Sequence, residues 1–322
     1  MNCIGVDIGS QEHVAYFPDR QETFRFSNTN SGFAAFQQKL TSHAEQEKLL
    51  VVMEATGVYH QRLAQYLHHE QVQVVVLNPA QVKYYAKSQL RRSKTDPVDA
   101  RIISEYASRH DLKSWVPLTT ARQHLQQACT AREAVLKTQQ QLQNVLHALQ
   151  QQAEPCGAVL EVLTQLRQQL QEAQEVLEDG VQQTLESQAE LQEEVQLLQS
   201  VPGIGPVVSV QLLANTGSLG RFSCSAALVC FAGMDVRMRQ SGKHEAGRHL
   251  SKVGHASLRK AAYQAALGAI RSKSRLGEYY RGLRLRGKPG KVALCALARK
   301  ILRIAFAVVK QGKPFDPAYP GP

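Results

Sequence analysis

The chain has 322 residues, 43% of them hydrophobic and 20% charged, which is enough for two or three domains with their own cores and excludes a disordered protein. No stretch approaches the roughly 18 uninterrupted apolar residues of a membrane span, and the N-terminus lacks a basic-then-apolar secretion signal. The six scattered cysteines form no C-x-x-C pair, so neither a zinc site nor a disulfide framework is indicated. These features predict a cytoplasmic protein without a membrane partner.

Positive charge is concentrated in the C-terminal part. The formal net charge is +11, but 21 Lys/Arg against 4 Asp/Glu from residue 201 onward give +17 and leave −6 for the first 200 residues. Such clustering predicts a surface that binds nucleic acid, since each counterion released from a phosphate favours binding. The competing interpretation is charge that serves only solubility.

Residues 1–112 alternate short apolar runs with amphipathic segments. The first three runs predict an antiparallel meander, and the later ones predict strands separated by helices. The predicted strands are 3–8, 13–17, 23–26, 49–54 and 72–77. The order β-β-β-α-β-α-β-α is that of a ribonuclease H-like (RuvC-type) α/β domain.

Four acidic residues of this domain stand where a nuclease-type sheet presents metal ligands. Asp7 and Glu54 end two apolar strands, and Asp96 and Asp99 lie three residues apart in a predicted first helical turn that contains Pro97. Converging carboxylates suit Mg²⁺, which prefers oxygen ligands and shares its shell with phosphate. Taken singly, each acid is equally explained as a helix cap, a dipole partner or a solvated strand end.

Residues 113–200 are rich in Gln, Glu and Leu, with leucines at three- and four-residue intervals. Pro155 and Gly157 interrupt the pattern, which predicts two long helices that fold back as a coiled-coil linker or dimerisation arm. Asp179-Gly180 is a candidate further kink.

Residues 201–322 are predicted to be a basic helical domain. Val201-Pro202-Gly203-Ile204-Gly205-Pro206 resembles a helix-hairpin-helix turn, whose amides can hold a phosphate, although similar turns also join helices for steric reasons. Helices are expected over 256–272 and 292–310, with a basic loop between them and a tail over 312–317.

A second candidate for the chemistry is Ser241, in a predicted loop crowded with cations. Its hydroxyl could attack a phosphodiester whose developing charge these cations stabilise, or it could simply contact a phosphate. Ser251, Tyr279 and Tyr280 are rival hydroxyls. The residues expected to contact nucleic acid are Arg237, Arg239, Lys243, Arg248, Lys252, Arg284, Arg286, Lys288 and Lys291.

Several motifs occur together and in order: Gly5-Val6-Asp7-Ile8-Gly9, Met53-Glu54-Ala55-Thr56-Gly57, Lys94-Thr95-Asp96-Pro97-Val98-Asp99, Val201-Pro202-Gly203-Ile204-Gly205 and Ser241-Gly242-Lys243. With these motifs the chain resembles the DEDD transposases of bacterial insertion sequences, also described as bridge-RNA-guided serine recombinases. The resemblance covers nearly the whole chain and is weakest in the Gln-rich middle.

The resemblance implies a role for each candidate residue. Asp7, Glu54, Asp96 and Asp99 would hold Mg²⁺ or Mn²⁺, and Ser241 would form a transient phosphoserine bond to DNA. It also implies donor and target DNA as substrates near the nucleoid, a structured bridge RNA as guide, and a homodimer that assembles as a dimer of dimers. In that assembly the serine of one protomer would complete the metal site of another.

The sequence leaves three alternatives open. A RuvC-like junction resolvase would use the same carboxylates for hydrolysis and would not need Ser241. A non-enzymatic nucleic-acid scaffold would gain nothing from four acids close to phosphate. A sugar-kinase-like ATPase would need a second glycine-rich phosphate loop.

Overall fold

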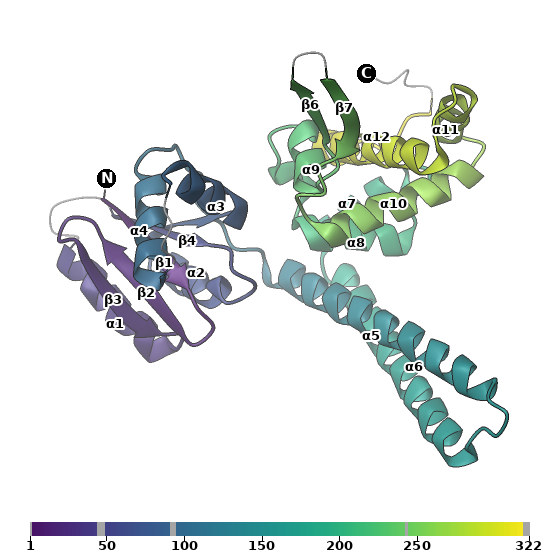
Figure 1. Ribbon diagram of the computed structural model, residues 1–322, viewed down its shortest axis with the longest axis horizontal. Coiled ribbons are helices and arrows are strands. Elements are labelled where there is room, and N and C mark those ends of the chain that lie inside the picture. Colours follow the sequence, from purple (N-terminus) through teal and green to yellow (C-terminus); the bar gives the residue numbers. More distant parts are fainter. Residues whose placement is uncertain (1, 44–48, 91–94, 242–243, 318–322) are drawn as a thin grey trace. The chain divides into compact units, whose positions relative to one another are not determined.

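The structure is a computed structural model that describes residues 2–43, 49–90, 95–241 and 244–317, without the side chains of 238–241 and 244–248. It divides into two compact units, Met1–Pro117 and Leu118–Pro322 (Figure 1). The helical arm therefore belongs to the same compact unit as the C-terminal helices, and its separate role over 113–200 stays a prediction. None of the helices in the described ranges is both long and apolar enough to cross a bilayer.

The N-terminal unit contains a five-stranded mixed sheet. Its strands are β1 (Asn2–Ile8), β2 (Glu12–Phe17), β3 (Glu22–Ser27), β4 (Leu49–Glu54) and β5 (Gln73–Leu77). They lie in the order β3-β2-β1-β4-β5. The first three form the predicted antiparallel meander, and β4 and β5 continue the sheet in parallel with β1. The observed order of strands and helices matches the predicted one.

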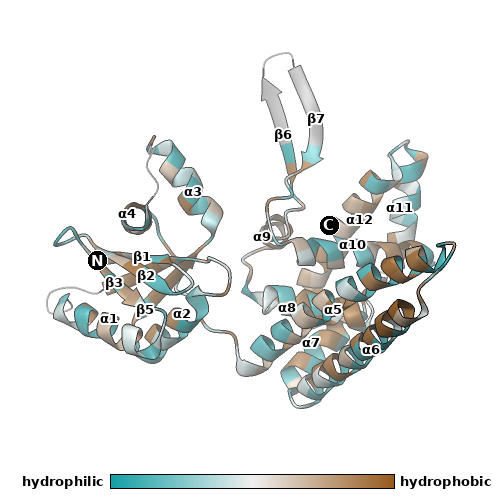
Figure 2. Cartoon of the chain, turned by 60° about the horizontal axis from the view of Figure 1, so that its bottom comes forward, coloured by the Kyte–Doolittle hydropathy of each residue, from teal (hydrophilic) through white to brown (hydrophobic). Residues whose placement is uncertain are grey.

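Helices cover both faces of the sheet, with α1 and α2 on one side and α3 and α4 on the other (Figure 2). Their bounds are Asn30–His43, His60–His69, Pro79–Ser88 and Asp96–Ala107. Phe17, Phe36 and Leu63 belong to the core on the α1–α2 side, whereas Val52 and Ile103 belong to the core on the α4 side. Residues of β1 and β4 alternate between these cores, as the two-residue period of a strand requires.

Two long helices form a hairpin at the start of the C-terminal unit (Figure 1). Helix α5 spans Thr120–Gln150 and α6 spans Gly157–Glu186, so the chain reverses around Pro155 and Gly157 as predicted. Leu142 and Leu146 are buried along the hairpin, and Arg132 pairs with Glu178 across it at 2.7 Å. Helix α6 continues past Asp179-Gly180 and ends at Glu186, so the chain does not leave the helix there.

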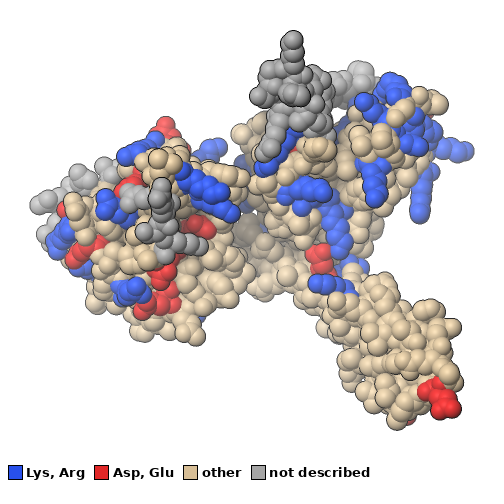
Figure 3. Space-filling model, in the orientation of Figure 1, with Lys and Arg blue, Asp and Glu red and all other residues tan. Residues whose placement is uncertain are grey.

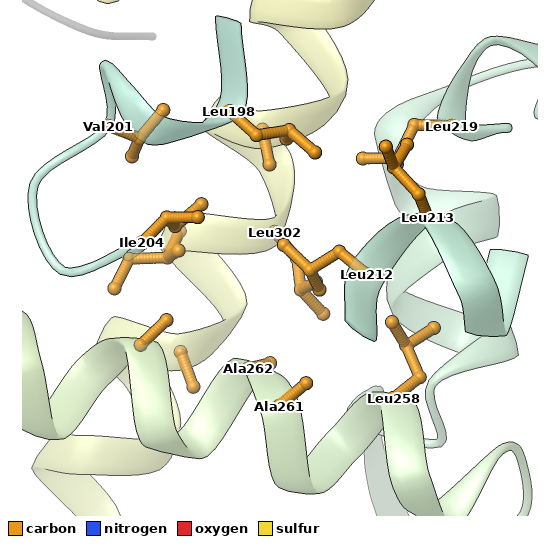
Figure 4. Close-up of a cluster of buried hydrophobic side chains, with 14 of the residues drawn as sticks. Leu198, Val201, Ile204, Leu212, Leu213, Leu219, Leu258, Ala261, Ala262 and Leu302 are labelled. Atoms are coloured by element: carbon orange, nitrogen blue, oxygen red, sulfur yellow. The ribbon is translucent and has the colours of Figure 1, made fainter. Parts of the chain in front are cut away.

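The rest of this unit is a helical bundle with one small β-hairpin. Its elements are α7 (Ala189–Gln199), α8 (Pro206–Thr216), the 3-10 helix η1 (Leu219–Arg221), α9 (Ser225–Phe231), β6 (Val236–Ser241), β7 (His244–Leu250), α10 (Ala256–Arg271), α11 (Arg275–Leu285) and α12 (Gly290–Gln311). Leu198, Leu212, Leu258 and Leu302 meet in its core from four different helices (Figure 4). Alanines on α10 allow its neighbours to approach closely.

Gly203 has a steric role in the turn between α7 and α8. Its φ is +95°, and a Cβ built there would lie 2.2 Å from the carbonyl oxygen of Ala265 and 2.8 Å from the Cβ of Ala269. A side chain is excluded both by the backbone conformation and by the contact with α10. This contact explains the glycine by packing, while phosphate binding by the turn stays a prediction.

Two predictions for the C-terminal part are wrong. The basic loop predicted before residue 292 is largely helix α11, which buries Leu276 and Gly277 and carries its arginines on the outside. The predicted tail is anchored, because the N–H of Phe315 donates to Ser200 Oγ at 2.8 Å and its ring packs against the bundle core. Both segments are rich in polar residues, but burial of one or two apolar residues, such as Leu276 and Phe315, fixes their structure.

Candidate active site

Asp7 and Glu54 lie side by side at the carboxyl ends of two parallel strands. Val6 of β1 is the register partner of Met53 of β4, so the next pair along the strands is Asp7 and Glu54. Val6 and Met53 face the α1–α2 core. Because successive side chains alternate, Asp7 and Glu54 point toward the α4 side of the sheet.

Helix α4 brings two more carboxylates to this edge. Asp96 and Asp99 lie in its first turn, which contains Pro97, and the N–H of Asp99 donates to the Thr95 carbonyl at 2.9 Å. Within the described part of the chain, the Thr95 side chain makes no capping bond to this helix. The cap interpretation therefore does not account for Thr95, and the carboxylates remain at the helix start.

Gly5 allows α4 to lie directly against β1. A Cβ at this position would stand 2.1 Å from the Ala100 carbonyl oxygen and 2.5 Å from the Ser104 nitrogen. One turn further along, Ser104 Oγ donates to the Cys3 carbonyl at 2.6 Å. The first turn of α4 is thus held close to the end of β1, where Asp7 stands.

The charges of the other three carboxylates act on Asp7. The pKa of the Asp7 carboxyl is raised to about 6, first by burial and then by the charges of Asp99, Asp96 and Glu54, against the lowering effect of the Ile8 N–H. Repulsion of this kind is what a bound cation would relieve. No three His, Cys, Asp or Glu side chains within the described ranges are already grouped as a metal site. The oxygen donors suit a hard divalent cation.

Ser241 is the last residue of β6, in the other compact unit. The prediction of a loop over this segment is wrong, because β6 and β7 pair antiparallel from Val236↔Leu250 to Ser241↔His244. In β6, the uncharged residues Val236, Met238 and Gln240 alternate with Arg237, Arg239 and Ser241. This two-residue period is typical of a strand, but the many charges of the segment made it hard to recognise. Ser241 therefore stands at the tip of a β-hairpin, with Gly242 and Lys243 outside the described residues.

Ser251, a rival hydroxyl, has a structural partner at the base of the same hairpin. Its Oγ donates to Asp235 Oδ1, and its N–H donates to the Asp235 carbonyl at 2.9 Å. Next to this pair, the N–H of Lys252 donates to the Gly233 carbonyl at 3.0 Å. Sequence reasoning missed Asp235, since the strand pairing that brings the two residues together was not predicted.

The cations expected to contact nucleic acid fall into two groups on the C-terminal unit. Arg237, Arg239, Arg248 and Lys252 belong to the β6–β7 hairpin or its base, with Lys243 outside the described residues. Arg284, Arg286, Lys288 and Lys291 lie on α11, at its end and at the start of α12. Figure 3 shows Lys and Arg side chains gathered over the region of α11. Arg284 Nη1 also donates to the Lys288 carbonyl at 2.6 Å.

Comparison with known proteins gives a consistent set of relatives. The chain is 26% identical over 321 residues to the pilin gene-inverting protein of Moraxella bovis, covering 97% of each chain. It is 25% identical to the transposase of insertion sequence IS1328 from Yersinia enterocolitica, covering 83% of this chain and 85% of the relative. Among solved structures, Thermus thermophilus RuvC aligns with 36% of this chain and all of its own, with 13% identity and a TM-score of 0.27.

Two family profiles match different parts of the sequence. Residues 4–155 match a transposase profile of the DEDD type from IS110 elements. Residues 195–281 match the profile of the transposase IS116/IS110/IS902 family. The first match contains the four carboxylates, and the second contains the β-hairpin that carries Ser241. The chain belongs to the IS116/IS110/IS902 family of transposases.

Proposed function

We propose that this chain, a DNA transposase or recombinase by family, cuts and rejoins insertion-sequence DNA through a transient phosphodiester bond to Ser241. The observation that supports the proposal is that the charges of Asp99, Asp96 and Glu54 raise the pKa of Asp7. Several negative charges close together repel a phosphate unless a cation binds between them, so we infer a bound cation.

Asp7, Glu54, Asp96 and Asp99 would hold Mg²⁺ or Mn²⁺. The ion would supply charge stabilisation for the phosphate that reacts. Glu54 and Asp7 would approach it from the sheet edge, and Asp96 and Asp99 from the first turn of α4.

In the proposed step, Ser241 Oγ forms a bond to phosphorus while the bond from phosphorus to one sugar oxygen breaks. The serine proton leaves to a base, and the departing sugar oxygen takes up a proton. The number of phosphoester bonds is unchanged, so a second sugar hydroxyl can reverse the step and rejoin strands without ATP. Arginines of the β6–β7 hairpin would stabilise the charge on the phosphate.

The proposal includes partners beyond DNA. A structured bridge RNA would select donor and target by base pairing, while the basic C-terminal unit grips the backbones. The chain would act as a dimer of dimers, with the serine of one protomer completing the carboxylate site of another. Apolar side chains on helix α6 of the α5–α6 hairpin are exposed, such as Val162 with an exposed fraction of 63% and Val176 with 70%, and they support self-association.

The test is cleavage of junction DNA, with the flanking RNA and Mg²⁺, followed by a denaturing gel that reveals protein attached to DNA. We expect an adduct that is lost in Ser241→Ala and in Asp7→Ala. The competing function is hydrolysis by a RuvC-like nuclease, in which water attacks instead of serine. Cleavage without an adduct, surviving Ser241→Ala, would establish that alternative.

A further inference from the structure

Arg221 holds its charge in an unusual setting at the end of η1. Its guanidinium carbon lies 5.1 Å from the ring centroid of Phe222 and 5.3 Å from that of Phe231. The two rings are 5.3 Å apart and tilted by 56°. Arg221 is exposed to solvent, although partial desolvation by its neighbours lowers its pKa, and no carboxylate or carbonyl in the described part of the chain is paired with it. The fold therefore orients a cation without giving it an internal anion.

His255 lies against the same aromatic ring. Its imidazole is 5.8 Å from the Phe231 centroid at an angle of 24°, and its Nδ1 accepts the N–H of Leu258 at 3.3 Å. In the neutral ring the proton therefore sits on Nε2, which makes that nitrogen a donor. Burial lowers the pKa of His255, and the charges of Arg221 and Arg259 lower it further against the effect of Glu133, which favours this neutral form.

The charges around the His255 imidazole are predominantly positive. Arg259 Nη1 donates to the Ala232 carbonyl at 2.8 Å, which keeps a second guanidinium in place. Glu133, the carboxylate that acts on His255, accepts from Lys260 Nζ at 2.8 Å and from Ser257 Oγ at 3.0 Å. The negative charge of Glu133 is thus balanced by Lys260. The positive charge of Arg221 can therefore be balanced by the anion of a ligand.

We propose that Arg221, seated on Phe222 and Phe231 with His255 beside it, binds a backbone phosphate of a nucleic-acid strand. The planar guanidinium can donate two parallel hydrogen bonds to phosphate oxygens, and the aromatic faces fix its plane. The inference rests on the proposed function for its nucleic-acid substrate. It adds a contact outside the cations expected from the β6–β7 hairpin and from α11.

The test measures binding of two probes, the junction DNA duplex and the flanking RNA, over a series of salt concentrations. Arg221→Met keeps an apolar cover over the rings but removes the charge and its donors. Arg167→Met is the matched control, because Arg167 lies on the α6 arm and bonds Gln143 at 3.2 Å. We expect roughly tenfold weaker binding of one probe for Arg221→Met and no change for the control.

Salt dependence identifies the contact as a phosphate. Loss of one phosphate contact should make the negative slope of log K against log salt shallower by about 0.9 for duplex DNA, or by about 0.7 for a single strand. The probe whose slope changes is the strand that occupies the site. Arg221→Lys, which keeps a cation over the rings but loses the planar fork, should bind several-fold more weakly at unchanged Tm.

Wild-type affinity and slope in both Arg221 variants would overturn the inference and leave the proposed function intact. Failure of the wild-type protein to bind either probe would instead overturn both. If Arg221→Met lowers Tm, the Arg221→Lys variant decides the question by its affinity at unchanged Tm.

Discussion

The carboxyl group of Asp7 has an altered pKa because of its position in the fold of the N-terminal unit. Its raised pKa of about 6 reflects first its burial and then the charges of Asp99, Asp96 and Glu54. Between about pH 4 and pH 6 the folded chain binds more protons at this site than the unfolded chain. The free energy of unfolding contributed by Asp7 is therefore highest below this window and is lost as the pH rises through it.

Asp7→Asn should consequently stabilise the metal-free protein above pH 6. We expect a gain of about 1 kcal/mol at neutral pH, after allowance for solvent screening of a partly exposed site, and a smaller gain near pH 4. Urea denaturation in chelator, followed by the fluorescence of Trp115, reports on this unit. Mg²⁺ should then stabilise the wild type more than Asp7→Asn. A gain that is independent of pH would contradict the assignment.

Gly5 is the residue that sets the approach of α4 to β1. Gly5→Ala should destabilise the N-terminal unit by about 3 kcal/mol, because the new methyl would overlap the backbone at Ala100 and Ser104. Gly180→Ala should have the opposite effect, because a Cβ built at Gly180 would have no neighbouring atom within 4 Å and the residue lies inside α6. That variant should gain roughly 0.5 to 1 kcal/mol. Equal effects of the two changes on thermal unfolding would argue against the close contact.

Replacing Ser241 and replacing Ser251 by alanine should have different effects. Ser251 is bonded to Asp235 at the hairpin base, so Ser251→Ala should loosen the hairpin and reduce strand joining without abolishing it. Ser241→Ala should leave no covalent adduct at all. Hydrogen exchange across β6 and β7 should rise in Ser251→Ala alone. Complete loss of the adduct in Ser251→Ala, with hydrogen exchange like that of the wild type, would transfer the nucleophile assignment to Ser251.

At the scale of elements, α6 presents a second apolar stripe besides the one that faces α5. Val159, Val162, Leu166 and Val176 recur at three-, four- and ten-residue intervals and are 42–70% exposed. Such a stripe costs free energy in water unless another surface covers it. The stripe makes the arm the part of the chain best suited to contact a second copy.

Replacing Val162 and Leu166 together by Gln should therefore lower the oligomeric state in solution. Light scattering of the purified protein measures the mass directly. Gln165→Ser, a polar exposed position between the two, is the control and should leave the mass unchanged. An unchanged mass in the double variant would exclude this stripe from the interface.

Elements with a strong apolar pattern could be predicted from the sequence. Leu49–Met53 is an unbroken apolar run, as a buried parallel strand requires, and Pro97 marks the first turn of α4. The β6–β7 hairpin and α11 could not be recognised, because charges dominate both and only a few side chains of α11, such as Leu276, are buried. Their structure follows from packing and strand pairing, which composition does not reveal.

At the scale of the whole molecule, the candidate chemistry is divided between two compact units. The acidic site belongs to residues 1–117, and Ser241 together with the basic surface belongs to residues 118–322. The places of the carboxylates could be predicted because Asp7 and Glu54 stand at the ends of apolar strands and Asp96 and Asp99 in a first helical turn marked by Pro97. The Arg221 site and the Asp235–Ser251 pair could not, since they depend on contacts between residues that are up to 34 positions apart in the sequence.

Covalent attachment of Ser241 to DNA can be tested directly by peptide mass analysis of the adduct. Trypsin separates the candidates, since Ser241 falls in Gln240–Lys243, Ser251 in His249–Lys252, and Tyr279 and Tyr280 in Leu276–Arg281. After nuclease trimming of a Mg²⁺-dependent reaction, we expect a nucleotide on the peptide that contains Ser241. A nucleotide on either of the other peptides, or cleaved DNA with no modified peptide, would exclude Ser241 as the nucleophile.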